Sequence, residues 1–309
     1  MPGSIVKHSL SFDVEEHFQV SAFESPMRRR HWEQFDSRVE NNTEKLLGLL
    51  AQRGVHATFF VLGWVAERYP ALVRSIASAG HEVASHGYAH ELITAQTQIA
   101  FREDIRKAKG ILESILQQPV LGYRAPSFSI TKDTMWAVQI LVEEGYVYDS
   151  SIFPVVHDRY GMPSANPHLH QLSTPAGLLW EVPPSTVKCF GVRLPVAGGG
   201  YFRLYPYPLL RALLRKLEGE GCPLVMYMHP WEFDPDQPRM EGSMVSRVRH
   251  YLNLHKTEAR MRALLQDFSF QPIRHVFPQI EQTPRGNLTA PSVVGNASMG
   301  ATSSSACLN

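Results

Sequence analysis

The chain has 309 residues, of which 44% are hydrophobic and 19% are charged. This composition is typical of a globular protein with a sizeable core, in one large domain or two ordinary ones. Its 30 basic and 29 acidic side chains leave a formal charge of +1, which gives no electrostatic reason to expect nucleic acid or an anionic membrane surface as a partner.

The N-terminal residues and the cysteines indicate a cellular location. Residues 1–12 lack the long apolar region of a secretory signal, and no apolar run approaches the roughly 20 residues that cross a bilayer. Cys189, Cys222 and Cys307 are odd in number and far apart, as reduced, incidental thiols are. We therefore expect a soluble, cytoplasmic protein without a transmembrane segment, of unspecified oligomeric state.

Extended and helical patterns alternate along most of the chain. Short apolar runs predict strands at 9–14, 57–62, 81–85, 120–124, 146–148, 180–183, 223–229 and 268–271. Helical periodicity, ended in several places by glycine, predicts helices at 42–53, 64–79, 97–116, 131–144, 207–220 and 243–265. The pattern dissolves between residues 154 and 173, which predicts a long loop, and Gly198–Gly200 predicts a tight turn.

This alternation predicts an α/β fold with a parallel sheet covered by helices. A doubly wound nucleotide-binding sheet would have a GxGxxG turn after its first strand, and the sequence has none there, so we favour a (β/α) barrel. The barrel would form a single domain over residues 1–280. Ser, Thr, Ala, Gly and Pro dominate residues 281–309, which predicts a disordered tail.

The segment Ser-His-Gly-Tyr-Ala-His at residues 85–90 follows the third expected strand. If this segment turned into a helix, His86 and His90 would lie on one face. Two such imidazoles need only a carboxylate from elsewhere to hold a divalent cation. Because histidine pairs at this spacing also occur by chance, the surrounding structure must decide.

Reactive residues end or follow four of the expected strands: Asp13 and Glu15, then His86 and His90, then Arg124, and finally His229. Each alone has an ordinary structural explanation, such as capping, ion pairing or core packing. In parallel barrels, however, catalytic groups come from the C-terminal ends of several strands. The shared position favours one functional site.

Asp13 and Glu15 are two residues apart on an expected strand, so they face the same side. Two close carboxylates repel each other unless a cation lies beside them. Glu15 with His86 and His90 would form a two-histidine, one-carboxylate metal site, which leaves Asp13 free to act as a base. If the strand ends earlier, Glu16 or His17 could replace Glu15.

Four segments resemble motifs of the polysaccharide deacetylase family, also called the NodB-homology fold or carbohydrate esterase family 4. They are Ser11–Glu15, Ser85–His90, Tyr123–Pro126 and Leu224–His229, and the similarity spans roughly residues 9–277. The resemblance implies a distorted (β/α) barrel that hydrolyses N-acetyl groups on a carbohydrate bearing N-acetylhexosamine. It also implies a divalent metal, with zinc as the expected ion.

The resemblance assigns a role to each candidate residue. The metal ligands would be Glu15, His86 and His90. Asp13 would take a proton from the attacking water, and Arg124 would keep Asp13 ionised. The backbone N–H of Ser127 would meet the oxyanion and His229 would protonate the leaving amine, with Glu181 as the candidate carboxylate partner of His229. Trp231 could stack on a sugar or pack in the core.

The chain also departs from the usual family pattern. Val14 stands where the family has a second aspartate, and Ser127-Phe128 follows the third motif. Gly198–Arg203 and His229–Asp234 resemble deacetylases of exosortase-type exopolysaccharide loci, which implies a subgroup-specific portion at about 155–280 and a role in exopolysaccharide biosynthesis. Three alternatives stay open: an iron(II) oxygenase, an amidase of the same fold acting on a small cyclic amide, and an inactive carbohydrate-binding relative.

Overall fold

The computed structural model describes residues 6–23, 29–189 and 191–282, and it has an α/β fold in which strands and helices alternate. The main sheet contains β1 (His8–Val14), β2 (Thr58–Val61), β3 (Glu82–Ser85), β4 (Gly122–Tyr123), β5 (Tyr148–Asp149), β6 (His170–Thr174), β7 (Gly177–Glu181), β10 (Val225–Met228) and β11 (Phe270–Gln271). The helices are α2 (Val39–Ala51), α3 (Gly63–Arg68), α4 (Pro70–Ser78), α5 (Gln98–Leu116), α6 (Trp136–Glu143), α7 (Gly199–Leu204), α8 (Tyr207–Gly219), α9 (Met244–Tyr251), α10 (Thr257–Asp267), α11 (Ile273–Val276) and α12 (Gln279–Gln282).

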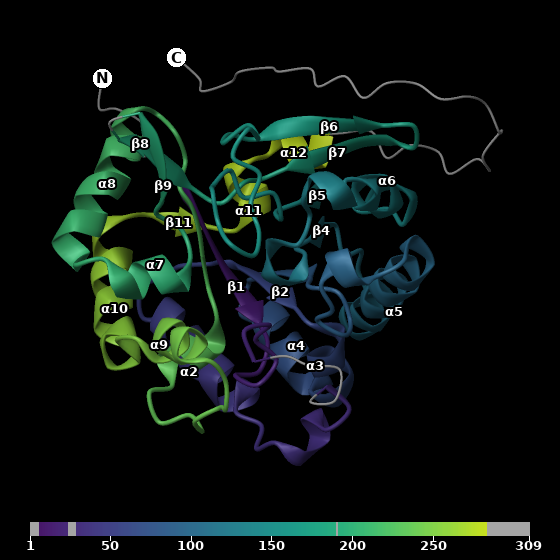
Figure 1. Cartoon of the computed structure of the whole chain (residues 1–309), viewed down its shortest axis with the longest axis horizontal. Coiled ribbons are helices and arrows are strands. Elements are labelled where there is room, and N and C mark those ends of the chain that lie inside the picture. The colour runs from purple at the N-terminus through teal and green to yellow at the C-terminus, as the bar shows by residue number, and fades with distance from the viewer. Residues whose placement is uncertain (1–5, 24–28, 190, 283–309) are drawn as a thin grey trace.

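The central strands are covered on both faces. Every residue of β1, β2, β3 and β10 is buried, as expected for parallel strands flanked by helices. Strands β1 and β2 lie in the middle of the molecule, with α8, α9 and α10 to one side and α5 and α6 to the other (Figure 1). This arrangement brings the C-terminal ends of the parallel strands together.

The strand order is β10-β1-β2-β3-β4-β5-β7-β6, in which all neighbours are parallel except β6 and β7. The segment after β7 returns to β10: the Ser185 N–H donates to the carbonyl of Val225 at 3.1 Å, and the Val225 N–H donates to Ser185 Oγ at 2.8 Å. In the described chain, one backbone hydrogen bond and one bond from the backbone to a serine hydroxyl, with no regular ladder, thus connect the two sides. The predicted distorted (β/α) barrel is confirmed.

Two of the expected helices are each divided in two. The helix predicted at 64–79 is interrupted at Tyr69, whose backbone is not helical because Pro70 follows it. The helix predicted at 243–265 breaks at Asn253, which adopts the left-handed conformation with φ +54°. Both breaks come from local backbone restrictions that apolar periodicity does not register.

Three strands lie outside the sequence prediction. Strand β6 begins within the expected loop at 154–173, where its mostly half-buried and mostly polar residues gave no apolar run. Strands β8 (Thr186–Cys189) and β9 (Val192–Pro195) form a separate antiparallel hairpin. The glycines at 198–200 lead directly into α7, where the sequence predicted only a turn.

In the part of the chain that the structure describes, no helix is both long and apolar enough to cross a membrane. The predicted tail begins at Glu281, which with Gln282 belongs to α12. Residues 283–309 of that tail, including Cys307, lie outside the described residues.

Candidate active site

The three predicted metal ligands meet at the C-terminal end of the barrel. Glu15 Oε2 lies 2.6 Å from His90 Nε2 and 3.7 Å from His86 Nε2, and all three side chains are buried. Their ligand atoms lie within 4.8 Å of one another, so one ion could contact all three. Glu15 directly follows β1, and His86 directly follows β3.

The histidines are held by a turn, so the conditional expectation of a helix at 85–90 is wrong. Asp104 of α5 accepts the backbone N–H groups of Tyr88 at 2.7 Å and Ala89 at 2.9 Å. Gly87 has φ +72°, and a Cβ there would approach the Asp104 carboxylate to 2.8 Å. The Asp104 carboxylate therefore shapes the turn that brings His90 back toward His86.

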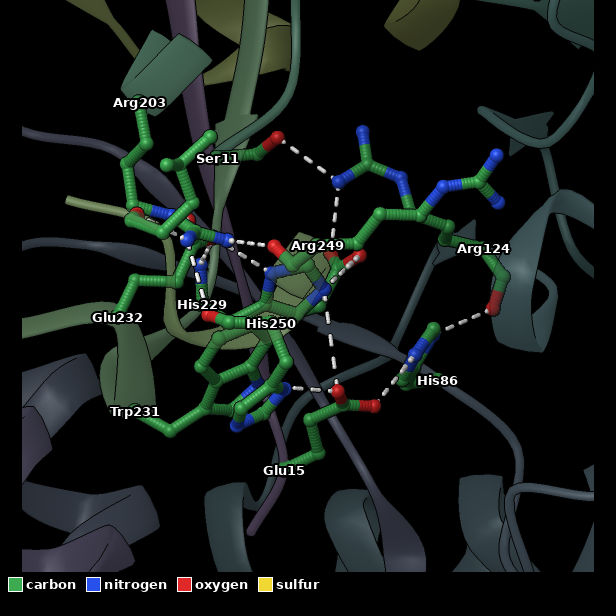
Figure 2. Close-up of polar contacts among 12 residues, drawn as sticks. Ser11, Glu15, His86, Arg124, Arg203, His229, Trp231, Glu232, Arg249 and His250 are labelled. Atoms are coloured by element: carbon green, nitrogen blue, oxygen red, sulfur yellow. Dashed lines mark hydrogen bonds and ion pairs between the residues drawn. The ribbon is translucent and has the colours of Figure 1, made fainter. Parts of the chain in front are cut away.

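Neighbouring groups orient the ligands in a way that fits a cation. His86 Nδ1 contacts the Arg124 carbonyl at 2.8 Å, which leaves Nε2 as the nitrogen that faces Glu15. The Trp231 indole N–H donates to Glu15 Oε1 at 3.2 Å, as Figure 2 shows. Within the described chain, Glu15 Oε2 makes no hydrogen bond of good geometry although it is buried. A buried carboxylate oxygen facing two imidazoles suits a divalent metal.

Asp13 lies beside this group and is held by Arg124. The guanidinium donates through Nη1 to Asp13 Oδ1 at 2.7 Å and to Ser11 Oγ at 2.9 Å, and Arg124 is fully buried. The other carboxylate oxygen of Asp13 faces His229, with Oδ2 3.9 Å from His229 Nε2. Asp13 and Glu15 therefore do face the same space, as their spacing predicts.

The carboxylate partner of His229 is Glu232, so the prediction of Glu181 is wrong. His229 Nδ1 lies 2.7 Å from Glu232 Oε1, which also accepts the His229 backbone N–H at 3.0 Å. Glu181 ends β7 and instead accepts the backbone N–H of Ile152 at 3.0 Å. Glu232 comes three residues after His229 in the sequence. It reaches the His229 ring because residues 230–233 form a short 3₁₀ helix that folds back toward His229.

Arg203 completes the group around His229. Its Nε donates to Glu232 Oε2 at 2.7 Å, and its Nη1 donates to the carbonyls of His250 and Leu252. At Gly199 a Cβ would come within 1.8 Å of the Glu232 carboxylate, so only glycine allows α7 to approach this closely. No role for Arg203 could be predicted from sequence, because nothing local links it to Glu232, which lies 29 positions away.

Electrostatics favour a charged His229 and an ionised Glu232. Burial opposes the charged imidazolium, but Glu232, Glu15 and Asp13 outweigh it and raise the pKa of His229 to about 9. Burial also opposes ionisation of Glu232, yet Arg203 and His229 hold its pKa below its usual range. Burial likewise disfavours ionisation of Glu15, but its neighbours, chiefly His90, outweigh burial and hold the pKa of Glu15 well below its usual value.

Ser127 and Trp231 complete the set of predicted residues. Ser127 lies in the short turn Pro126–Phe128 with φ +50°, and its Oγ is 2.6 Å from Ser21 Oγ. Trp231 is buried between the rings of His229 and His250, at centroid distances of 5.0 and 4.2 Å. Its indole supports Glu15 from within the core, and does not present a face to a sugar.

Comparisons with known proteins divide the chain near residue 150. The family model described as "Polysaccharide deacetylase" matches residues 26–147. Residues 26–147 of this chain are therefore similar to polysaccharide deacetylases. A second model, described as "Domain of unknown function (DUF3473)", matches residues 150–278. His86, His90 and Arg124 thus lie in the deacetylase match, whereas His229 and Glu232 lie in the second.

Curated relatives agree with the domain. A peptidoglycan-N-acetylglucosamine deacetylase of Bacillus cereus is 34% identical over 98 residues, which are 31% of this chain and 36% of that protein. A chitooligosaccharide deacetylase of Rhizobium leguminosarum bv. trifolii is 38% identical over 76 residues, 25% of this chain and 35% of that protein. The chain therefore spans about a third of the length of these relatives.

Solved structures show the same fold over nearly the whole chain. A proposed polysaccharide deacetylase from Mycobacterium smegmatis aligns with a TM-score of 0.61 and 22% identity, covering 95% of this chain and 97% of that one. The Puue allantoinase aligns with a TM-score of 0.59 and 14% identity, covering 92% of this chain and 93% of that one. At these identities the likeness establishes the fold and not the reaction.

Proposed function

We propose that this protein is a metal-dependent hydrolase that removes N-acetyl groups from N-acetylhexosamine units of a polysaccharide or of its oligosaccharide precursor. One observation carries the proposal. The cluster of Glu15, His86 and His90 lies next to two further titratable side chains, Asp13 and His229, that are not needed as ligands. Such a set has a cation site, a base and an acid within one buried space.

Glu15, His86 and His90 would hold the cation, and we propose zinc. Two imidazoles and one carboxylate with an open position are typical of catalytic zinc sites. When bound, the ion would supply Lewis acidity toward the acetyl oxygen and would acidify a water molecule. The turn that Asp104 holds, together with the contact between His86 and the Arg124 carbonyl, would keep the two imidazoles in place.

Asp13 would accept the proton of the attacking water. Arg124 binds Asp13 Oδ1, which leaves Oδ2 facing His229. His229 would donate a proton through Nε2 to the leaving amine, since Nδ1 is held by Glu232 and the pKa of about 9 keeps the ring charged at neutral pH. The Ser127 backbone N–H would donate to the developing oxyanion.

A role in exopolysaccharide biosynthesis, on a lipid-linked or oligosaccharide intermediate in the cytoplasm, belongs to the same proposal. Its support is the resemblance of Gly198–Arg203 and His229–Asp234 to deacetylases of exopolysaccharide loci. These two segments lie against each other through Arg203 and Glu232, whose side chains form a buried ion pair at 2.7 Å. The subgroup-specific residues thus support the proposed catalytic acid.

The proposal is tested by measuring acetate release from a panel of N-acetylated sugars and oligosaccharides, with chelator and with added zinc. We expect release from at least one oligosaccharide, its loss with chelator and its return with zinc. Hydrolysis of a small cyclic amide instead would favour the amidase alternative, whose fold the allantoinase shares. Carbohydrate binding without hydrolysis of any substrate would indicate the inactive relative, and activity only in the presence of oxygen would indicate the oxygenase.

A further inference from the structure

Two buried carboxyl groups lie behind the proposed site and have no role in the chemistry above. Asp149 ends β5 and Glu181 ends β7, and the two residues are paired in the parallel register of these strands. Neither side chain is exposed to solvent. They lie close enough to form a hydrogen bond with each other when one of them carries a proton.

The remaining contacts of the two groups leave one oxygen of each for that bond. Asp149 Oδ1 accepts the Ser151 hydroxyl and Glu181 Oε1 accepts the Ile152 N–H. Asp149 Oδ2 and Glu181 Oε2 have no other hydrogen-bond partner in the described part of the chain. A proton between these two oxygens would satisfy both of them.

Electrostatics also favour one proton on the pair. Burial raises the pKa of each group, and the pKa of Glu181 is raised further by the neighbouring Asp149. Two carboxylates in contact in a buried site do not both ionise readily. We therefore expect the pair to hold one negative charge and one proton at neutral pH.

The backbone that the pair anchors holds Arg124 and Ala125. Ser151 Oγ, bound to Asp149, accepts the Ala125 N–H at 2.7 Å. Ser150 lies between Asp149 and Ser151 and accepts two hydrogen bonds from Arg124. Its carbonyl accepts from Nε at 3.1 Å, and its hydroxyl oxygen accepts from Nη2 at 2.8 Å. Residues 149–152 thus bind the guanidinium on the side away from Asp13 and fix the start of the Pro126–Phe128 turn.

We propose that Asp149 and Glu181 are positioning residues that share one proton and thereby hold Arg124 and the Ser127 turn in the geometry that catalysis by Asp13 requires. The proton has an electrostatic purpose as well. A second negative charge on the pair would compete with Asp13 for the single charge of Arg124. The role in catalysis rests on the proposed function, whereas the shared proton does not.

The kinetic test compares two substitutions at one position. Glu181→Gln keeps an N–H donor toward Asp149 and an oxygen for Ile152, so we expect kcat close to that of the wild type. Glu181→Ala removes both contacts, and we expect kcat to fall by about 10-fold to 100-fold with little change in KM, since a misplacement of about 1 Å can cost about 100-fold. Equal losses in both variants would overturn the shared proton.

Glu82 provides a matched control, because it is a buried carboxylate at the opposite end of the same barrel. Both Glu82→Gln and Glu82→Ala should reduce thermal stability and leave kcat unchanged. If the Glu82 variants lost kcat in proportion to Glu181→Ala, the effect at Glu181 would be one of general stability, and the positioning role would be wrong.

Infrared spectroscopy of the full chain tests the proton without substrate. We expect the wild type to show a protonated-carboxyl band at neutral pH that Glu181→Gln loses and Asp104→Asn retains. Absence of this band would overturn the proposal even if Glu181→Ala failed to fold. If no substrate releases acetate but the band is present, the proposed function fails while the shared proton stands.

Discussion

The two ends of the barrel each bury a charged cluster, and they differ in how completely its polar atoms are paired. At the N-terminal end, Glu82 accepts hydrogen bonds from Thr58 Oγ1 at 2.7 Å, Tyr148 OH at 2.9 Å and Arg274 Nε at 2.8 Å. At the C-terminal end, Glu15 Oε2 faces the His86 and His90 rings without a hydrogen bond of good geometry, and His90 Nδ1 is buried without a hydrogen-bond partner in the described chain.

This difference separates structure from function. Buried polar groups in folded proteins are almost always paired, and an unpaired one calls for an explanation such as a missing ion. The pairs around Glu82 join β2, β3, β5 and α11, which is a structural task. The Glu15 cluster leaves its atoms available for a ligand. Substitutions at the two ends should therefore have opposite consequences.

The largest effect is expected for the two histidine ligands. His86→Ala and His90→Ala should each weaken metal binding more than about 100-fold, because even the loss of a group that only orients a ligand costs 10-fold to 100-fold. Acetate release should disappear with the metal. Metal content measured by elemental analysis checks this. His81 is a buried histidine that accepts the Ala57 N–H, and the control variant His81→Ala should bind metal as the wild type does. Full metal occupancy in His86→Ala or His90→Ala would refute the assignment of these two residues as ligands.

Asp13→Asn should separate catalysis from metal binding. We expect kcat to fall by about 100-fold to 10,000-fold, the usual range for a general base, while metal content stays near that of the wild type. Arg124 would keep a hydrogen-bond acceptor in the amide oxygen. Parallel measurements of acetate release and metal content check this, and loss of the metal would instead make Asp13 a ligand.

Glu232→Gln should change the pH dependence of turnover. His229 acts only when protonated, so wild-type activity should decline as pH rises through about 9. Without the Glu232 charge the pKa of His229 falls, so the alkaline decline in activity should move to lower pH. At a pH above the new pKa, activity should fall by about tenfold for each pH unit by which the pKa is lowered.

The raised pKa of His229 also makes the stability of the fold depend on pH. Because the folded pKa of His229 is raised, its contribution to the free energy of unfolding is present below pH 6.5 and is lost as pH rises through about 9. Glu232→Gln should reduce that loss. Glu258→Gln, at a surface carboxylate paired with Lys45, is the control. An unmoved pH profile in Glu232→Gln would exclude Glu232 as the partner of His229.

The smallest effect on activity is expected at the N-terminal end. Glu82→Gln should lower the free energy of unfolding by about 1–3 kcal/mol, because it weakens hydrogen bonds to a buried charged group. Metal content and kcat should not change. Chemical denaturation and steady-state kinetics check this, and a loss of kcat at unchanged stability would show that the two ends are not independent.

Much of the site could be predicted because its residues end strands. Asp13, Glu15, His86, Arg124 and His229 all follow short apolar runs, and parallel strands deliver their C-terminal ends to one face. The alternation that predicts the barrel therefore also predicts which side chains meet. The direction of the chain along each parallel strand was enough to predict which side chains meet, without knowledge of how the core packs.

The rest depends on contacts that sequence distance conceals. Glu232 had a local signal, three residues after a strand end, as in a capping box, whereas Glu181 was chosen for its own strand end. Arg203 reaches Glu232 only because Gly199 lets α7 approach, and the Asp149–Glu181 pair depends on strand register. Pro70 and Asn253 divided the helices through backbone conformation rather than hydrophobic pattern.

We expect the cluster of Glu15, His86 and His90 at the C-terminal end to be a metal-dependent hydrolytic site. The most direct measurement is acetate release from N-acetylglucosamine oligosaccharides by metal-free protein titrated with zinc. We predict that release rises with zinc up to one equivalent per chain and is absent from His86→Ala under the same conditions. Acetate release that is independent of zinc and chelator, or equal in His86→Ala, would show that this cluster is not a metal-dependent catalytic site.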